Sequence, residues 1–290
     1  MIHRYYKEGR KLDVAGLNQI TVLIDRSETE STEVGLNEWK PNLIGPPHLH
    51  RDKDQIFYFT SGIGLVKIGE DEYKVSERCI AYIPAGNVHR TINKNDQPLT
   101  YLLFNIFNDG GKEGHKSFAE HIENVKMTRK QQAETGKADV ENISIDFEIK
   151  KAKFFNNPGE GIRFDFGSNA TILLLDRKET NRCELTLVSW PAGNKGALVA
   201  HKEKEQIFFV LNGSGWVTIG NETEEVKPGE LIFVPRNTPH TTEAGTEDLT
   251  YLCMNGLSGE IKDLSFHEMF NRVSSARIER WKSGNKTIGE

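Results

Sequence analysis

The stretch PPHLHRDKDQIF, from Pro46 to Phe57, places two histidines two residues apart. Residues at that spacing face the same side of an extended strand, so both imidazoles can point toward one metal ion. A polar turn then leads to Gln55, which opens the next strand, and His89 opens another strand further on. If the strands close into a barrel, these side chains meet. We therefore predict His48, His50, Gln55 and His89 as metal ligands.

The same module is written twice in this chain of 290 residues. When the sequence is shifted by 151 residues, residues 20–91 and 171–242 share 23 identities in 72 ungapped positions, and the block LIDRSET recurs as LLDRKET. Duplication and fusion of one module explain this repeat. We predict two domains, residues 1–135 and residues 143–290.

Local patterns indicate the structure of each module. Short runs rich in β-branched and aromatic residues alternate with turns that contain glycine, proline and asparagine. Such spacing is typical of a β-sandwich or a small barrel. After the first module, Phe118, Ile122 and Val125 recur at helical spacing between polar residues. The predicted fold class is mainly β, with a helix after each module.

The pattern H-x-H-x4-Q-x6-G from His48, followed by P-x4-H from Pro84, resembles the two sequence motifs of the cupin family. Both halves show the pattern, so the resemblance covers most of the chain. It implies a bicupin, with two tandem cupin barrels (double-stranded β-helices, or jelly rolls), each followed by a helix. The first half departs from the family twice. Gln55 stands where cupins usually have a glutamate, and residues 77–79 lack the glycine that opens the second motif.

The second half departs further, because Val199 replaces the first histidine. The residues His201, Gln206 and His240 remain, and we predict them as a possible vestigial second site. Loss of one imidazole in three should weaken metal binding by orders of magnitude. The second barrel is then expected to be a degenerate copy that supports the first.

A glutamine ligand changes the chemistry that such a site favours. Three neutral imidazoles and a neutral amide leave the full double positive charge on the ion, which makes it a stronger Lewis acid. This favours isomerisation, tautomerisation or a lyase reaction over oxidation. The ligand set also resembles that of small cupins that convert unsaturated uronates to linear keto forms during pectin breakdown. Asp54, the neighbour of Gln55, is an alternative fourth ligand.

The leading hypothesis is a metal-dependent enzyme that acts on a small oxygen-rich substrate, a sugar acid or a keto acid, in the first barrel. Its cofactor would be one divalent transition metal, because sites rich in histidine accept Zn, Ni, Fe or Mn. A quercetinase-like Fe or Ni dioxygenase is the alternative enzyme. A bicupin that binds small molecules or sugars without catalysis is the third hypothesis. Six residues are candidates to contact an anionic substrate: Tyr82, Tyr101, Phe104, Arg51, Lys53 and Arg90.

Composition limits the other classes of function. A net charge of −5 and a pI of about 6.0 disfavour nucleic acid as a partner, because a polyanion requires a basic face. No apolar run reaches the roughly 18 residues of a membrane span, and the first residues have no apolar signal-peptide core. Three widely spaced cysteines are typical of reduced thiols in a cytoplasmic protein. The fused modules allow a monomer with a pseudo-twofold axis, or a homodimer.

Overall fold

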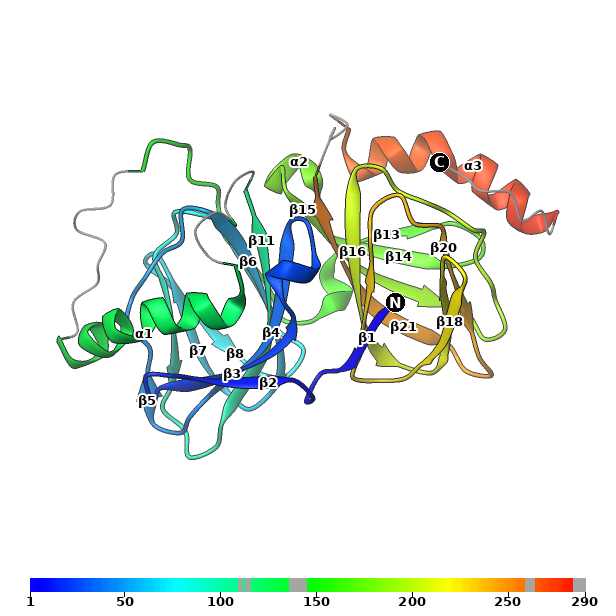
Figure 1. Cartoon of the computed structure of the whole chain (residues 1–290). Coiled ribbons are helices and arrows are strands. Elements are labelled where there is room, and N and C mark those ends of the chain that lie inside the picture. The colour runs from blue at the N-terminus through cyan, green and yellow to red at the C-terminus, as the bar shows by residue number, and fades with distance from the viewer. Residues whose placement is uncertain (109–111, 113–115, 136–144, 259–263, 284–290) are drawn as a thin grey trace. The chain divides into compact units, whose positions relative to one another are not determined.

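The computed structural model describes residues 1–108, 112, 116–135, 145–258 and 264–283. The chain divides into two compact units. The first unit spans Lys7–Asn157, and the second unit combines Met1–Tyr6 with Pro158–Glu290. Strands dominate both units, and one long helix follows each set of strands (Figure 1). The predicted mainly β class, with a helix after each barrel, is confirmed.

Two antiparallel sheets form the first unit. The larger sheet has the strand order β12-β9-β6-β11-β4-β3-β2, and the smaller has the order β5-β10-β7-β8. The larger sheet contains β2 (Arg10–Val14), β3 (Asn18–Ile24), β4 (Thr32–Trp39), β6 (Lys53–Ser61), β9 (Ile80–Ile83), β11 (Leu99–Phe107) and β12 (Lys153–Phe155). The smaller sheet contains β5 (Leu43–Ile44), β7 (Gly64–Ile68), β8 (Asp71–Val75) and β10 (His89–Asn93). The helical elements are η1 (Arg26–Glu28) and α1 (Phe118–Thr135).

The second unit repeats this architecture, as expected of a duplicated sequence. Its larger sheet has the order β1-β19-β16-β21-β15-β14-β13, and its smaller sheet has the order β18-β17-β20. The larger sheet contains β1 (Ile2–Tyr5), β13 (Ile162–Asp165), β14 (Ala170–Leu175), β15 (Cys183–Trp190), β16 (Lys204–Asn212), β19 (Glu230–Val234) and β21 (Leu249–Leu257). The remaining elements are β17 (Gly215–Ile219), β18 (Glu222–Val226), β20 (His240–Ala244), η2 (Pro158–Glu160), α2 (Arg177–Thr180) and α3 (Phe266–Lys282).

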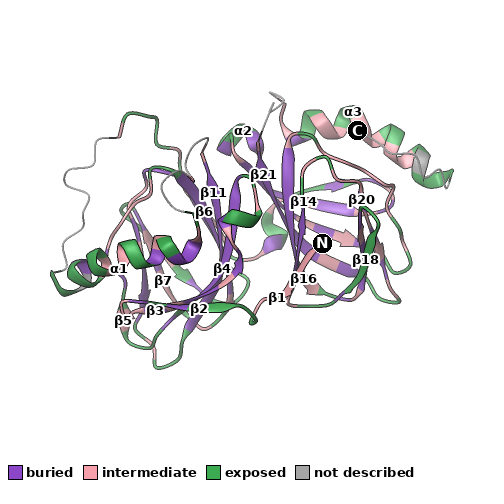
Figure 2. Ribbon diagram, viewed as in Figure 1, coloured by how far each residue is buried: buried purple, intermediate pink, exposed green. Residues whose placement is uncertain are grey.

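Alternation along the strands fills the interior of the first unit. Phe57 and Phe59 of β6 face the same side of the sheet as Tyr101 and Leu103 of β11. The ring centroids of Phe57 and Tyr101 stack at 4.4 Å. Buried residues therefore run along the strands, while much of α1 and α3 stays exposed (Figure 2). The polar residues Gln55 and Asn105, at one end of the same two strands, are also buried inside the barrel.

The helix α1 packs against the inward face of the larger sheet. Phe118 and Ile122 belong to the core cluster of the first unit, together with Ile20 of β3. A Cβ atom at Gly35 of β4 would lie 2.9 Å from the side chain of Ile20 and 3.1 Å from that of Phe118. Only glycine permits so close an approach of the helix to this strand. The helix thereby covers a part of the interior face.

The repeated LIDRSET block fixes the start of each long helix. The Asp25 carboxylate accepts hydrogen bonds from the backbone N of Ser27 at 3.0 Å and of Phe118 at 3.1 Å. In the second unit, Asp176 accepts one from the backbone N of Phe266 at 3.0 Å. One aspartate thus caps its own helical turn and also satisfies an N–H group at the start of a distant helix. This dual role gives a physical reason for the strong repeat at these positions.

Two short strands make the units differ from the expected domains, residues 1–135 and 143–290. Strand β1 pairs with β19, so that Ile2 lies opposite Phe233. Strand β12 pairs with β9, so that Phe154 lies opposite Ala81. Each short strand covers the edge of a larger sheet, which would otherwise present unpaired backbone groups. Both strands lie outside the repeated region, so the repeat does not show which module they join.

Deletion of residues 1–6 is expected to lower the free energy of unfolding of the second unit by about 2–4 kcal/mol, because about four ladder hydrogen bonds and their packing are lost. Hydrogen exchange measured by mass spectrometry should show faster exchange in β19. Strand β9 serves as the internal control, because β12 still covers its edge. Unchanged protection of β19 in the deletion variant would contradict this assignment of β1.

Candidate metal centre

The three predicted histidines of the first unit lie together. His48 and His89 are paired across an isolated bridge, with backbone N-to-O distances of 3.0 and 2.8 Å. His50 follows two residues after His48 and points to the same place. The ring centroids of His48 and His89 are 4.3 Å apart. The ring centroid of His50 lies 5.2 Å from that of His48 and 5.6 Å from that of His89. One nitrogen from each ring lies within 4.8 Å of the other two.

Backbone carbonyl groups determine which ring nitrogen is free to bind an ion. Nδ1 of His48 lies 3.0 Å from the carbonyl oxygen of Pro46, and Nδ1 of His89 lies 3.0 Å from that of Asn87. A carbonyl oxygen only accepts, so each Nδ1 carries the proton and each Nε2 keeps its lone pair. Nε2 of His89 is buried and has no hydrogen-bond partner. Such carbonyl partners orient the histidine ligands of metal sites.

The amide of Gln55 is oriented in the same way. Its Nε2 donates to Oδ1 of Asn105 at 2.9 Å, while its Oε1 is buried without a partner. Asp54, the alternative ligand, lies on the other face of β6. Its carboxylate accepts from the Tyr82 hydroxyl and from the backbone N of Ala85, both at 2.8 Å. Of these two neighbours, the arrangement leaves the Gln55 oxygen available to an ion.

A buried ionic network supports Gln55 from behind. Nδ2 of Asn105 donates to Oε1 of Glu33 at 2.7 Å. The Arg26 guanidinium donates to both oxygens of Glu33, at 2.8 and 3.0 Å. Nζ of Lys53, also buried, lies 3.9 Å from the same carboxylate. The orientation of the Gln55 amide is therefore determined by a chain of hydrogen bonds that ends at a buried ion pair.

Burial keeps the histidines neutral. It lowers the pKa of His89 to about 4 and lowers the pKa of His48 and of His50 well below the usual value. Positive charge on Arg129 and on Lys53 lowers all three values further. Neutral imidazoles offer lone pairs without first losing a proton. The donor set of imidazole nitrogens and an amide oxygen, with two buried atoms that lack partners, fits a divalent transition metal.

Arg129, on helix α1, is a residue near this centre that motif reasoning missed. Of the three cations considered from the sequence, Lys53 also acts on these histidines, but it lies beside Glu33. Arg51 forms an exposed ion pair with Asp146, and Arg90 alternates with His89 to the other face of β10. A signal for Arg129 exists in the repeat. The shift that aligns SFAEHIENV with SFHEMFNRV also aligns Arg129 with Arg277.

The second unit contains a partial copy of the centre. The ring centroids of His201 and His240 are 5.3 Å apart, and Nδ1 of His240 lies 2.9 Å from the Thr238 carbonyl oxygen. Oε1 of Gln206 is buried without a partner, as in the first unit. Val199 forms the bridge to His240 that His48 forms to His89. The backbone of the second unit therefore matches that of the first at this position, and only the histidine side chain is missing.

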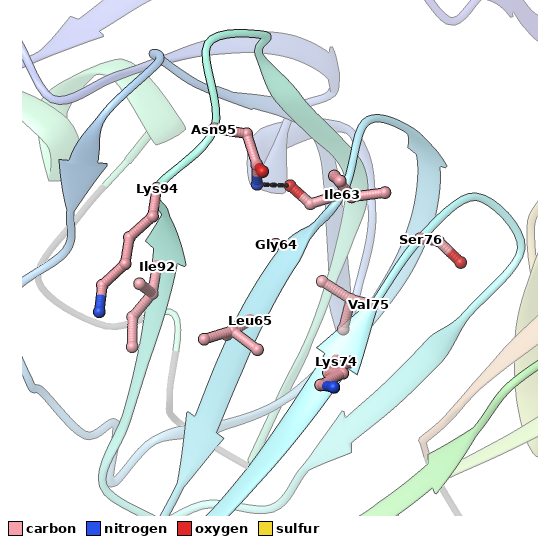
Figure 3. A pocket seen from close by; sticks show the side chains of 9 residues that line it. All are labelled: Ile63, Gly64, Leu65, Lys74, Val75, Ser76, Ile92, Lys94 and Asn95. Atoms are coloured by element: carbon pink, nitrogen blue, oxygen red, sulfur yellow. Dashed lines mark hydrogen bonds between the residues drawn. The ribbon is translucent and has the colours of Figure 1, made fainter.

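A surface hollow of about 430 Å³ lies on the small sheet of the first unit, over β7, β8 and β10 (Figure 3). Leu65, Lys74 and Ile92 line it, and the Asn95 amide donates to the carbonyl oxygen of Ile63 at one end. Ile92 is an odd number of residues from His89 along β10, so the two side chains point to opposite faces. The hollow is therefore separate from the histidine cluster.

Comparison with known proteins agrees with this architecture. The Cupin domain family matches residues 35–105 and 186–255, one match in each unit. An uncharacterized protein of Methanocaldococcus jannaschii is 42% identical over 64 residues, which are 22% of this chain and 51% of that protein. Quercetin 2,3-dioxygenase of Bacillus subtilis is 29% identical over 93 residues, 32% of this chain and 28% of that enzyme. The matches thus span about half the length of these relatives or less.

The fold is shared with solved structures of two-barrel proteins. A structure of oxalate decarboxylase from Bacillus subtilis matches with a TM-score of 0.60 and 14% sequence identity, over 88% of this chain and 76% of that chain. At this identity the match shows the fold alone. The two tandem jelly-roll barrels expected from the sequence are confirmed. Among the described residues, no helix is long and apolar enough to cross a membrane.

Glu33→Ala is expected to lower the free energy of unfolding of the first unit by about 3–5 kcal/mol, because it leaves Arg26 and Lys53 buried without their partner. Glu38→Ala, at an exposed position of the same strand, is the matched control and should change the free energy of unfolding by less than about 0.5 kcal/mol. Urea denaturation followed by tryptophan fluorescence measures both. Equal stability of the two variants would show that the network does not support this unit.

Proposed function

We propose that this chain, which belongs to the cupin family and carries two cupin domains, binds one divalent transition metal in its first domain and is an enzyme there. The proposed ligands are His48, His50, Gln55 and His89. The proposed substrate is a small oxygen-rich molecule, such as a sugar acid or a keto acid. The proposed reaction is an isomerisation, a tautomerisation or a lyase step without net oxidation.

The observation that carries this proposal is the pair of buried atoms without partners, Nε2 of His89 and Oε1 of Gln55. Leaving a buried polar group unsatisfied costs about 1–3 kcal/mol, so two such atoms beside two further imidazoles support a site built for a ligand. The Pro46 and Asn87 carbonyl groups orient the rings, and Asn105 orients the amide. The site is thus arranged before any ligand binds.

The neutral ligand set supports non-redox chemistry. A bound divalent ion would supply a Lewis acid that polarises a carbonyl or enolate oxygen of the substrate. The protein would position the substrate among buried aromatic side chains, since the Phe57 ring centroid lies 6.2 Å from that of His89. The Tyr101 hydroxyl is fully engaged, because it accepts from Asn37 and Trp39 at 2.9 Å. Burial raises its pKa to about 12, so Tyr101 stays protonated and is not a base at neutral pH.

A dioxygenase is the second candidate, because quercetin 2,3-dioxygenase is among the relatives that match by sequence. An oxygen electrode separates the two candidates. A substrate that is converted under argon at the same rate as in air supports the non-redox reaction. Consumption of one O2 for each substrate molecule would support the dioxygenase instead.

Metal analysis tests the proposed centre directly. We expect about one equivalent of metal per chain in the wild type, less than about a tenth of an equivalent in His50→Ala, and one equivalent in His201→Ala. Inductively coupled plasma mass spectrometry on protein loaded separately with Zn, Ni, Fe or Mn gives the numbers. Metal that remains in His50→Ala, or a wild type that takes up none of the four, would refute the centre and leave a bicupin that binds ligands without metal.

Val199→His is expected to add a second equivalent of metal, because the backbone pairing of Val199 with His240 matches that of His48 with His89. Val199→Ala is the control that changes the same position without supplying a ligand, and it should bind one equivalent. The same metal analysis measures both variants. A single equivalent in Val199→His would mean that the second unit has lost more of the site than one side chain.

A further inference from the structure

Arg129 is a half-buried cation whose guanidinium has no partner among the described residues. Its Nη1 atom is buried and unsatisfied, and no hydrogen bond or ion pair joins its guanidinium to any residue that the structure describes. Burial lowers its pKa to about 10, so the group is still charged at neutral pH. A buried charge is normally paired, because removing it from water is costly. A guanidinium left in this state therefore requires explanation.

The helix directs Arg129 toward the interior. Phe118, Ile122, Val125 and Arg129 are four, three and four residues apart, so they share one face of α1. The first two pack in the core of the first unit, and the same face thus continues from apolar side chains to the guanidinium. Gln132 follows one turn later on this face, and its buried Oε1 also lacks a partner. Figure 1 shows α1 alongside the strands of the first barrel.

Helix α1 covers the same interior that holds the histidine cluster. Phe118 packs at Gly35, which lies in register with Leu103 and Phe57. The Phe57 ring centroid in turn lies 6.2 Å from that of His89.

The charge of the Arg129 guanidinium lowers the pKa of His48, of His50 and of His89. Of the described residues in this unit, two carboxylates are buried, and both are engaged: Glu33 with Arg26 and Lys53, Asp54 with Tyr82 and Ala85. A divalent ion held by neutral ligands would add more positive charge. An anion is the component that would balance this charge.

In the second unit, the arginine at the position equivalent to Arg129 has a partner. Arg277, at the equivalent position of α3, lies over the Phe166 ring, with 5.2 Å from the guanidinium carbon to the ring centroid. By strand register, the residue that corresponds to Phe166 in the first unit is Val14, which offers no ring. The arginine is thus unpartnered in the barrel that has all three histidines, and stacked in the barrel where Val199 interrupts them.

We propose that Arg129 binds the carboxylate of the substrate, so that the substrate class of this site is small carboxylic acids. The inference rests on the proposed function, because it assigns a substrate class to the same site. A guanidinium matches a carboxylate with two parallel hydrogen bonds. The carboxylate end lies at α1, and the oxygen-rich remainder of the molecule points toward the histidines.

Calorimetric titration of the Zn-loaded protein tests this assignment. The probes are pyruvate and D-glucuronate, and their uncharged counterparts are hydroxyacetone and D-glucose. We expect at least one of the two acids to bind the wild type and to bind Arg129→Gln about 10- to 100-fold more weakly, which corresponds to the loss of hydrogen bonds to a charged group. Arg129→Lys, which keeps the charge but loses the planar fork, should fall between them.

Arg277→Gln is the matched control, and it should bind the acids like the wild type. Thermal unfolding checks that the variants fold. Arg129→Gln should be at least as stable as the wild type without ligand, because it removes an unpaired and half-buried charge. The acid should raise the melting temperature only of proteins that bind it. Acids that bind Arg129→Gln as well as the wild type, uncharged counterparts that bind equally well, or no binding of either acid to the wild type would each overturn the assignment.

The two proposals fail separately. Metal content measured on the same samples reports the metal centre, and it should be one equivalent in every Arg129 variant. If the wild type binds no metal but the acids still bind in an Arg129-dependent manner, the metal centre is wrong and the carboxylate site stands. If metal is present but binding of the acids does not depend on Arg129, the carboxylate site is wrong and the metal centre stands.

Discussion

The buried carboxylate of Glu33 is the constraint on which the first barrel depends. It accepts two hydrogen bonds from Arg26 and one from Asn105, and it lies beside Lys53. Two buried cations without this anion would be strongly destabilising. Through Asn105 the same carboxylate determines how the Gln55 amide points. Stability of the barrel and orientation of one proposed ligand therefore depend on a single ionised group.

The second barrel retains this network although its histidine set is incomplete. Glu184 accepts from Arg177 at 2.6 Å and from Asn255 at 3.2 Å, and Asn255 in turn accepts from Gln206 at 2.8 Å. A network that persists where Val199 interrupts the histidines has a structural role of its own. The network first of all pairs buried charges. The orientation of the glutamine amide oxygen is a consequence of that pairing.

Positive charge connects the proposed metal centre with helix α1, which carries Arg129. The charged side chains that act on the three imidazoles are the cations Arg129 and Lys53, and the buried carboxylates of Glu33 and Asp54 already have partners. Such an interior favours an anionic ligand, because an anion offsets both the guanidinium of Arg129 and an ion held by neutral donors. The departure from the usual cupin glutamate to Gln55 has the same consequence. It leaves more positive charge for the ligand to balance.

The sequence by itself determined the duplication, the two barrels, and the spacing of His48, His50 and His89, because short-range alternation dictates which side chains share a face. It did not determine which module receives the strands β1 and β12, since both lie outside the repeat and pair with distant edges. Nor did the motifs reveal Arg129. Only the tertiary structure decided that residue's place, because the packing of Phe118 against Gly35 sets the position of the helix, and with it the position of a cation more than two turns further along.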